Sequence, residues 1–127
     1  MSGRILVVDD EKGIVETLTA ILCMKGYKVD TATDGVDGYE KACLLRPDLI
    51  ISDISMPRLN GVEMAIRISA EFPNARILLF SGQAMTLELL QQARVRGYNF
   101  ECLMKPFHPQ DLIHKIEALL GPQPIAS

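Results

Sequence analysis

The stretch ILVVDDE, residues 5–11, joins four apolar residues directly to three acids. Four consecutive apolar residues are typical of a strand that is buried on both faces, as in a parallel sheet. The acids would crowd at the end of such a strand, where two carboxylates about 4 Å apart repel each other by roughly 4 kcal/mol at an effective dielectric constant near 20. The stretch therefore predicts a central strand with a charged site at its carboxyl end, and something positive must offset the repulsion.

Four further segments have the pattern of strands. The runs at residues 49–51 and 77–80 are continuous and apolar, so both predict central strands. Residues 27–32, YKVDTA, and residues 98–104, YNFECLM, alternate between apolar and polar side chains. Alternation is typical of strands with one exposed face, and we therefore expect these two segments at the edges of the sheet.

Helical spacing fills the intervals between the strands. The segments with this spacing are residues 14–22, 35–45, 60–71, 85–96 and 112–120, with Gly26, Arg46-Pro47, Phe72-Pro73 and Gly121 as stop signals. Strands that alternate with helices predict an α/β fold with a parallel sheet and right-handed crossovers. With the half-polar strands at the edges, the order is 2-1-3-4-5, which is the flavodoxin-like, doubly wound (βα)5 arrangement.

Length and composition restrict the class of protein. The 127 residues correspond to one domain, which we expect over residues 1–121, and the Pro-containing end at residues 122–127 reads as a short tail or the start of a linker. The formal net charge of −3 argues against a protein that binds nucleic acid through its whole surface, although it leaves a local basic patch open. No apolar run is long enough for a membrane helix. We also expect no signal peptide.

The cysteines indicate a compartment rather than a site. Cys23, Cys43 and Cys102 are odd in number, scattered and set among apolar residues, and their spacing fits no metal site. We interpret them as buried thiols of a protein in a reducing compartment, with the cytoplasm as the default.

The ends of the predicted strands bring charged residues together. In an open α/β sheet, sites form beyond the carboxyl ends of the strands, near the switch in strand order. Those ends carry three carboxylates, a hydroxyl and an ammonium group, from Asp9, Asp10, Asp53, Ser81 and Lys105. The positive partner of the acids is either Lys105 or a divalent cation, and a cluster of carboxylate oxygens suits Mg²⁺.

These residues resemble the receiver domain of response regulators in two-component signalling. The resemblance is carried by the acid pair 9–10, DISMPRLNG at residues 53–61, Ser81, and KPF at residues 105–107, and it extends to about residue 120. The pattern D-x-x-M-P-x-x-x-G is matched in full. Each motif is weak alone, but their order and their positions at strand ends make the combination specific.

The resemblance implies a role for each residue at the strand ends. Asp53 would accept a phosphoryl group as an acyl phosphate. Lys105 would neutralise charge on the phosphoryl oxygens, and the Ser81 hydroxyl would bind one of them. The Lys105-Pro106 peptide bond is expected to be cis.

The same resemblance implies a metal site and a set of partners. Mg²⁺ or Mn²⁺ would be held by Asp9, Asp10, Asp53 and the main-chain carbonyl of Ser55. A sensor histidine kinase or phosphotransfer protein would supply the phosphoryl group, in a phosphorelay, to a domain that is a signalling phosphoacceptor rather than an enzyme. A downstream protein would read the face made by the fourth helix, fifth strand and fifth helix, with no direct nucleic-acid or membrane binding, in a monomer or weak dimer.

Two positions differ from the family pattern. Receivers usually carry Tyr or Phe three residues before the lysine of the fifth strand, where this chain has Cys102, so the usual aromatic readout is absent. Gly82 stands where Ala is common. In the family, two positions flank the path of the water that hydrolyses the acyl phosphate, and here they are occupied by Ser55 and Gln83. The chain is either a stand-alone receiver or a part of a longer regulator.

Other interpretations of the same residues remain open. Asp9 or Asp10 could cap the first helix. A Mg²⁺-dependent phosphatase of the haloacid-dehalogenase type is disfavoured, because such enzymes place an acid two residues after the nucleophile, where this chain has Ser55. A receiver-like interaction scaffold that works without phosphorylation is the main alternative.

Overall fold

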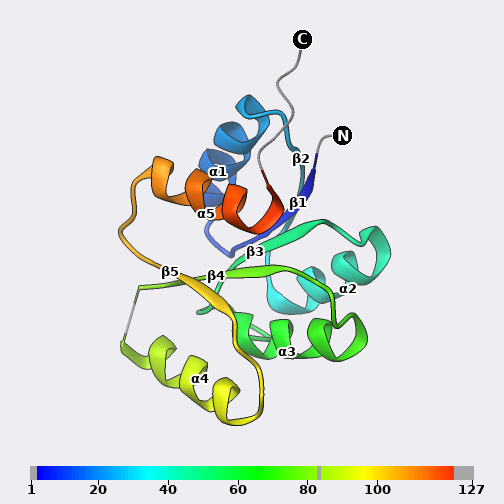
Figure 1. Ribbon diagram of the computed structural model, residues 1–127, viewed down its shortest axis with the longest axis vertical. Coiled ribbons are helices and arrows are strands. Elements are labelled where there is room, and N and C mark those ends of the chain that lie inside the picture. The colour runs from blue at the N-terminus through cyan, green and yellow to red at the C-terminus, as the bar shows by residue number, and fades with distance from the viewer. Residues whose placement is uncertain (1–2, 83, 122–127) are drawn as a thin grey trace.

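The protein is a three-layer α/β sandwich, described in a computed structural model for residues 3–82 and 84–121. Strands and helices alternate along the chain, with the sheet between two layers of helices (Figure 1). The strands are β1 (Arg4–Val8), β2 (Lys28–Ala32), β3 (Leu49–Asp53), β4 (Ile77–Ser81) and β5 (Glu101–Met104). The helices are α1 (Lys12–Met24), α2 (Gly35–Leu45), α3 (Gly61–Glu71), α4 (Ala84–Val95) and α5 (Pro109–Leu120). None of these helices is both long and apolar enough to cross a membrane.

The sheet confirms the predicted topology. Its order is β2-β1-β3-β4-β5, and each neighbouring pair is parallel. The apolar strands β1, β3 and β4 are central, and the half-polar strands β2 and β5 form the edges, as the alternation of their residues predicted. The strand order reverses between β1 and β3, so the carboxyl ends of these two strands form a site in which ligands of this class of fold bind.

Each face of the sheet has its own apolar core. Residues of β1, β3 and β4 alternate between the two faces, and α1 and α5 cover one of them while α2, α3 and α4 cover the other (Figure 1). The fully buried side chains toward α1 and α5 include Ile5, Ile51, Leu78 and Ile116. Those toward α2 and α3 include Leu6, Ile50, Leu79 and Met64. Both faces of the central strands are therefore dry, which explains their uninterrupted apolar sequences.

Two strands are shorter than their sequence patterns predicted. β5 was expected from residue 98 but begins at Glu101, where its pairing with Leu78 of β4 starts. Tyr98 and Phe100 instead stack on each other with ring centroids 6.0 Å apart. β2 begins one residue late because the backbone N–H of Tyr27 donates to the carbonyl of Leu22 in the turn that ends α1.

The expected burial of the cysteines is wrong. Cys23 is exposed on α1, and Cys43 and Cys102 are only half-buried, although all three are free thiols. Leu22, which precedes Cys23, lies on the buried face of this amphipathic helix, whereas Met24, which follows it, is 87 % exposed. The apolar character of the sequence neighbours therefore did not report the surroundings of Cys23. The burial of these thiols therefore gives no support to the inference of a reducing compartment.

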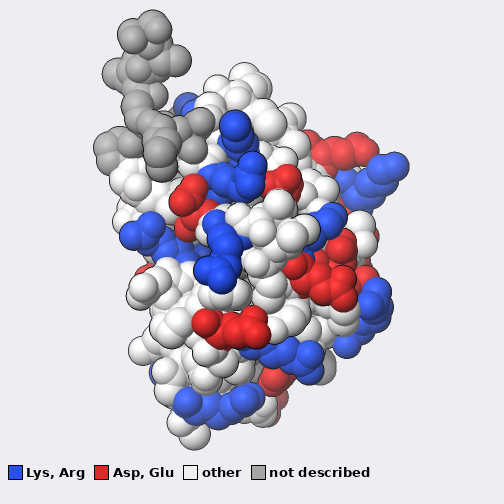
Figure 2. All heavy atoms as spheres, turned by 90° about the vertical axis from the view of Figure 1, so that its right-hand side faces the viewer, with Lys and Arg blue, Asp and Glu red and all other residues white. Residues whose placement is uncertain are grey.

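Charge on the surface is mixed in sign. On the face shown in Figure 2, basic and acidic side chains of the described residues lie among one another and are not gathered into separate fields. Several of the ion pairs join neighbouring elements, such as Arg58–Asp34 at 3.0 Å and Arg96–Glu63 at 3.2 Å. This face lacks the concentrated positive charge on which sequence-independent nucleic-acid binding depends.

The glycine that ends the DISMPRLNG motif is required by close packing. Gly61 begins α3, and its backbone N–H donates to the carbonyl of Ile54 at 2.8 Å. A Cβ atom at this position would lie 2.3 Å from the carbonyl oxygen of Asp53. The motif therefore lets α3 start directly against the end of β3, and this contact fixes the backbone that carries Asp53.

We expect Gly61→Ala to lower the free energy of unfolding by about 2–3 kcal/mol, because a buried methyl group without space costs on that order. The matched control is Gly13→Ala in α1, where a Cβ meets no atom within 4 Å. This change should raise the free energy of unfolding by about 0.5–1 kcal/mol, through the lost flexibility of glycine. Urea unfolding measures both, and equal effects of the two substitutions would show that the contact with Asp53 imposes no constraint.

Candidate functional site

The site is built from the loops that follow four parallel strands. Asp9 and Asp10 follow β1, Asp53 is the last residue of β3, and Ser81 is the last residue of β4. Lys105 directly follows β5, and its backbone N–H donates to the carbonyl of Ser81 at 2.8 Å. The structure therefore brings together the residues that the sequence analysis placed at the strand ends.

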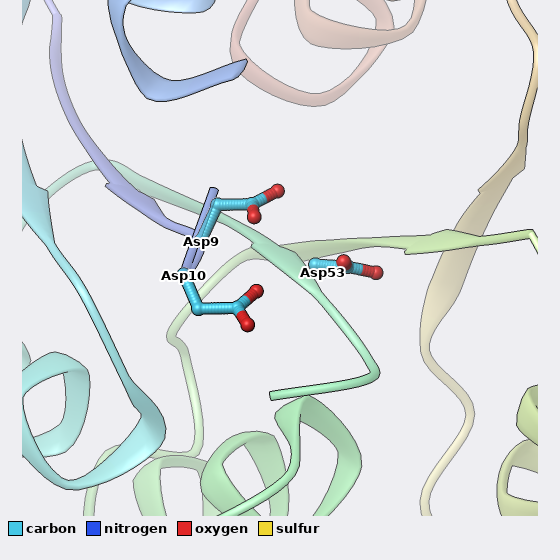
Figure 3. A group of neighbouring side chains, drawn as sticks. All are labelled: Asp9, Asp10 and Asp53. Atoms are coloured by element: carbon cyan, nitrogen blue, oxygen red, sulfur yellow. The ribbon is translucent and has the colours of Figure 1, made fainter. Parts of the chain in front are cut away.

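Three carboxylates form the centre of the site. Asp9, Asp10 and Asp53 each offer an oxygen atom, and these atoms all lie within 4.8 Å of one another. Asp9 is 1 % exposed and Asp53 is 7 % exposed, whereas Asp10 faces solvent. Figure 3 shows Asp9 and Asp10 projecting their carboxylates from the end of β1 beside Asp53 of β3. Burial of two acids beside a third concentrates negative charge where little solvent screens it.

The arrangement raises the pKa of Asp9. Burial raises the pKa of Asp9 to about 6, a hydrogen bond from the backbone N–H of Glu11 opposes the rise, and the charge of Asp53 adds to it. That N–H donates to Oδ1 of Asp9 at 2.9 Å. The capping interpretation fails for the first helix, because Glu11 is the N-cap residue of α1 and no side chain makes the cap hydrogen bond.

The second carboxylate oxygen of Asp9, Oδ2, is not satisfied by hydrogen bonding within the described part of the chain. Oδ2 of Asp9 is buried and has no hydrogen-bond partner among the described residues. A buried carboxylate oxygen without a partner is costly, so such an atom indicates a site for a ligand or a functional role. Three carboxylates within reach of one ion, of which Asp9 has an unsatisfied oxygen, fit a hard divalent cation such as Mg²⁺.

Lys105 supplies positive charge from the opposite side of the site. Its Nζ lies 3.3 Å from Oδ2 of Asp53, with the lysine side chain 27 % exposed and the aspartate side chain 10 % exposed. A single ammonium group cannot balance three carboxylates, so the cluster keeps a net negative charge. The peptide bond between Lys105 and Pro106 is cis, as predicted.

The raised pKa of Asp9 predicts a stability that depends on pH. Native Asp9 holds its proton more tightly than the unfolded chain, so its contribution is fully present below pH about 4 and is lost as the pH rises through about 6. Asparagine does not titrate in this range. The unfolding free energy of Asp9→Asn, taken as the difference from wild type, should therefore increase by about 2–3 kcal/mol when the pH is raised from about 4 to about 7. Urea unfolding in EDTA at both pH values measures this.

The control for this prediction is Asp30→Asn, which removes a surface acid that pairs with Arg4 at 3.5 Å. The difference between this variant and wild type should change little with pH, because exposed pairs contribute only about 0–1 kcal/mol. Parallel pH profiles for Asp9→Asn and wild type would contradict the prediction.

A cavity of about 1070 Å³ opens from the acids toward the helices α1 and α5. Asp10, Asp53 and Lys105 line it, together with Ser55, Gly82 and apolar side chains that include Ile14, Leu18, Phe80 and Phe107. Phe80 and Phe107 pack with ring centroids 4.8 Å apart. Ser55 is exposed in this cavity, and Gln83 lies outside the described residues.

The structure adds one residue that the sequence analysis missed. Ser81 has no exposed surface, and its Oγ is hydrogen-bonded to Oγ1 of Thr86, in the first turn of α4. Thr86 is 3 % exposed and lines the same cavity as Asp53. A threonine near a helix start is common, so only the meeting of β4 with α4 in space identifies this one.

Comparison with known proteins supports one family. The family model for the response regulator receiver domain matches residues 5–117. The response regulator MprA of Mycobacterium ulcerans is 36 % identical over 123 residues, which cover 94 % of this chain and 51 % of that protein. The chain thus spans about half the length of the curated relatives it matches.

Solved structures agree with this result. A CheY-like receiver domain protein from Methanospirillum hungatei superposes with a TM-score of 0.86 at 29 % identity, covering 94 % of each chain. The response regulator TrrA of Thermotoga maritima, solved in complex with Mg²⁺-BeF, superposes with a TM-score of 0.82 at 35 % identity over 94 % of this chain and 100 % of that one. This chain belongs to the response regulator receiver domain family of two-component signalling.

Proposed function

We propose that this domain is the phosphoacceptor of a two-component pathway, with Asp53 as the residue that is phosphorylated. The observation that carries the proposal is the position of the Asp53 carboxylate. It contacts the ammonium group of Lys105 at 3.3 Å on one side and shares a three-carboxylate cluster on the other. A nucleophile between a fixed cation and a cation-binding cluster is the arrangement that phosphoryl transfer requires, because catalysis there is mainly positioning and charge stabilisation.

The proposed reaction transfers a phosphoryl group from a phosphohistidine to Asp53. A carboxylate oxygen of Asp53 attacks the phosphorus, the P–N bond breaks, and the imidazole leaves with the electron pair and takes up a proton from water. Lys105 holds a phosphoryl oxygen during transfer, and the cavity gives the donor access to Asp53. Mg²⁺, which Asp9, Asp10, Asp53 and the carbonyl of Ser55 would hold, supplies positive charge to the phosphoryl oxygens when bound.

The proposed partners are a phosphoryl donor and a downstream protein. The donor is a sensor histidine kinase or phosphotransfer protein of the cytoplasm. The proposed output face consists of α4, β5 and α5, on which Leu87 is 46 % and Met104 is 50 % exposed. A cavity of about 360 Å³ lies between α4 and β5, and Cys102 lines it with Leu87, Leu90 and Phe100. The small thiol leaves this space open, which supports readout by side-chain insertion rather than by a ring of this chain.

The mass of the intact protein after incubation with acetyl phosphate and Mg²⁺ tests the function. A gain of one phosphoryl group that depends on Mg²⁺ supports the phosphoacceptor. Continuous turnover of phosphate esters without a mass gain would indicate a hydrolase. The absence of both would favour an interaction scaffold that works without phosphorylation.

A further inference from the structure

The hydroxyl groups of Ser81 and Thr86 form a buried pair beside the proposed phosphorylation site. Ser81 ends β4, and Thr86 lies in the first turn of α4. Their Oγ and Oγ1 atoms are hydrogen-bonded, and the two residues are 0 % and 3 % exposed. The pair therefore connects the sheet directly to the start of α4.

The two hydroxyl groups differ in their access to the site. Thr86 lines the cavity that also contains Asp53, Gly82 and Lys105, whereas Ser81 has no exposed surface. The backbone of Ser81 is held as well, since its carbonyl accepts the N–H of Lys105 at 2.8 Å. Ser81 is not part of the cavity lining, so its hydroxyl reaches a phosphoryl oxygen on Asp53 only after the side chain turns toward the cavity.

We propose that Thr86 is a positioning residue that holds Ser81 in its unphosphorylated orientation and couples that orientation to α4. The inference rests on the proposed function, in which Asp53 carries the phosphoryl group. Phosphorylation offers Ser81 a charged acceptor, and hydrogen bonds to ionised groups are roughly twice as strong as neutral ones. Ser81 exchanges Thr86 for the phosphoryl oxygen, and the first turn of α4 loses its hydrogen bond to the sheet.

A ligand can shift this equilibrium only through its different affinity for the two orientations of Ser81. Removing the Thr86 hydroxyl lowers the cost of turning Ser81 toward the site. We therefore expect Thr86→Val to bind a phosphoryl analogue about fivefold more tightly, which corresponds to about 1 kcal/mol. Thr86→Ser keeps the hydroxyl and should bind within about twofold of wild type.

The experiment is a double-mutant cycle with beryllofluoride and Mg²⁺, which forms a tetrahedral analogue of the acyl phosphate on an aspartate. Affinities are measured for wild type, Thr86→Val, Ser81→Ala and the double variant, with Thr86→Ser as the conservative control. In the Ser81→Ala background, Thr86→Val should have no further effect, because the group that it releases is gone. The cycle removes from the comparison every other contact that Thr86 makes.

Each outcome decides the inference. Tighter binding by Thr86→Val that disappears with Ser81→Ala supports it, and unfolding free energies in the absence of the analogue show that each variant is folded. Three results would overturn it. Thr86→Val could have an equal effect in both backgrounds, or it could bind the analogue no more tightly than wild type. The third result is a Thr86→Ser variant that behaves like Thr86→Val. Binding by wild type in any of these cases leaves the proposed function standing, whereas a wild type that binds no beryllofluoride contradicts both.

Discussion

Asp53→Asn is expected to abolish phosphoryl uptake from acetyl phosphate while leaving the protein folded. The amide has no anionic oxygen to attack phosphorus, and no other carboxylate contacts Lys105 within the described part of the chain. The substitution also removes one of three crowded negative charges. The unfolding free energy in EDTA should therefore stay within about 1 kcal/mol of wild type or rise, because repulsion relieved offsets the lost partner of Lys105.

The measurements are the mass of the intact protein and urea unfolding, with Asp30→Asn as the charge-matched control. The control should take up one phosphoryl group as wild type does. Two results would count against the assignment. A phosphoryl gain that persists in Asp53→Asn would place the acceptor elsewhere, and a loss of more than about 2 kcal/mol in stability would mark Asp53 as a structural residue.

Asp10→Asn is expected to slow phosphoryl uptake by about 100-fold at limiting Mg²⁺, since even groups outside the first set of ligands change metal affinity by about 10–100-fold. Asp10 is the exposed member of the three-carboxylate cluster and the one that a hydrated ion reaches most easily. The nucleophile Asp53 is intact in this variant, so the defect should shrink as the Mg²⁺ concentration is raised.

Glu11→Gln is the matched control for Asp10. Glu11 is the next residue, is exposed and lines the same cavity, but it lies outside the group of acids whose oxygens approach one another. Its rate of phosphorylation and its dependence on Mg²⁺ should stay close to those of wild type. A rate for Asp10→Asn that matches Glu11→Gln at every Mg²⁺ concentration would remove Asp10 from the metal site.

The acids that follow β1 repel one another, and a positive partner must offset this repulsion. The carboxylates are held together by a rigid sheet, and their repulsion is only partly balanced by Lys105. The unsatisfied oxygen of Asp9 and its raised pKa both indicate that the crowding of these carboxylates opposes the stability of the fold. A divalent cation held by the three carboxylates would reduce this repulsion, and the proposed function depends on such a cation.

The fold was predictable because parallel sheets leave a strong pattern in the sequence. Strands buried on both faces need continuous apolar runs, and edge strands tolerate alternation, so residues 5–8, 49–51 and 77–80 were assigned to the centre. The convergence of Asp9, Asp53 and Lys105 then followed from topology alone, since the carboxyl ends of parallel strands meet at one edge. The family resemblance assigned roles to these residues, and those roles remain predictions that the proposed experiments test.

The sequence by itself thus determined the order of the elements, the strand order and the residues of the charged site, because periodicity and strand ends are local properties of the chain. Only the tertiary structure decided the burial of Cys23, the start of β5 and the partner of Ser81. Each of these depends on which element packs over a given side chain. The pairing of Ser81 with Thr86 joins a strand end to a helix start, and such a contact between two hydroxyl groups leaves no periodic pattern in the sequence that could reveal it.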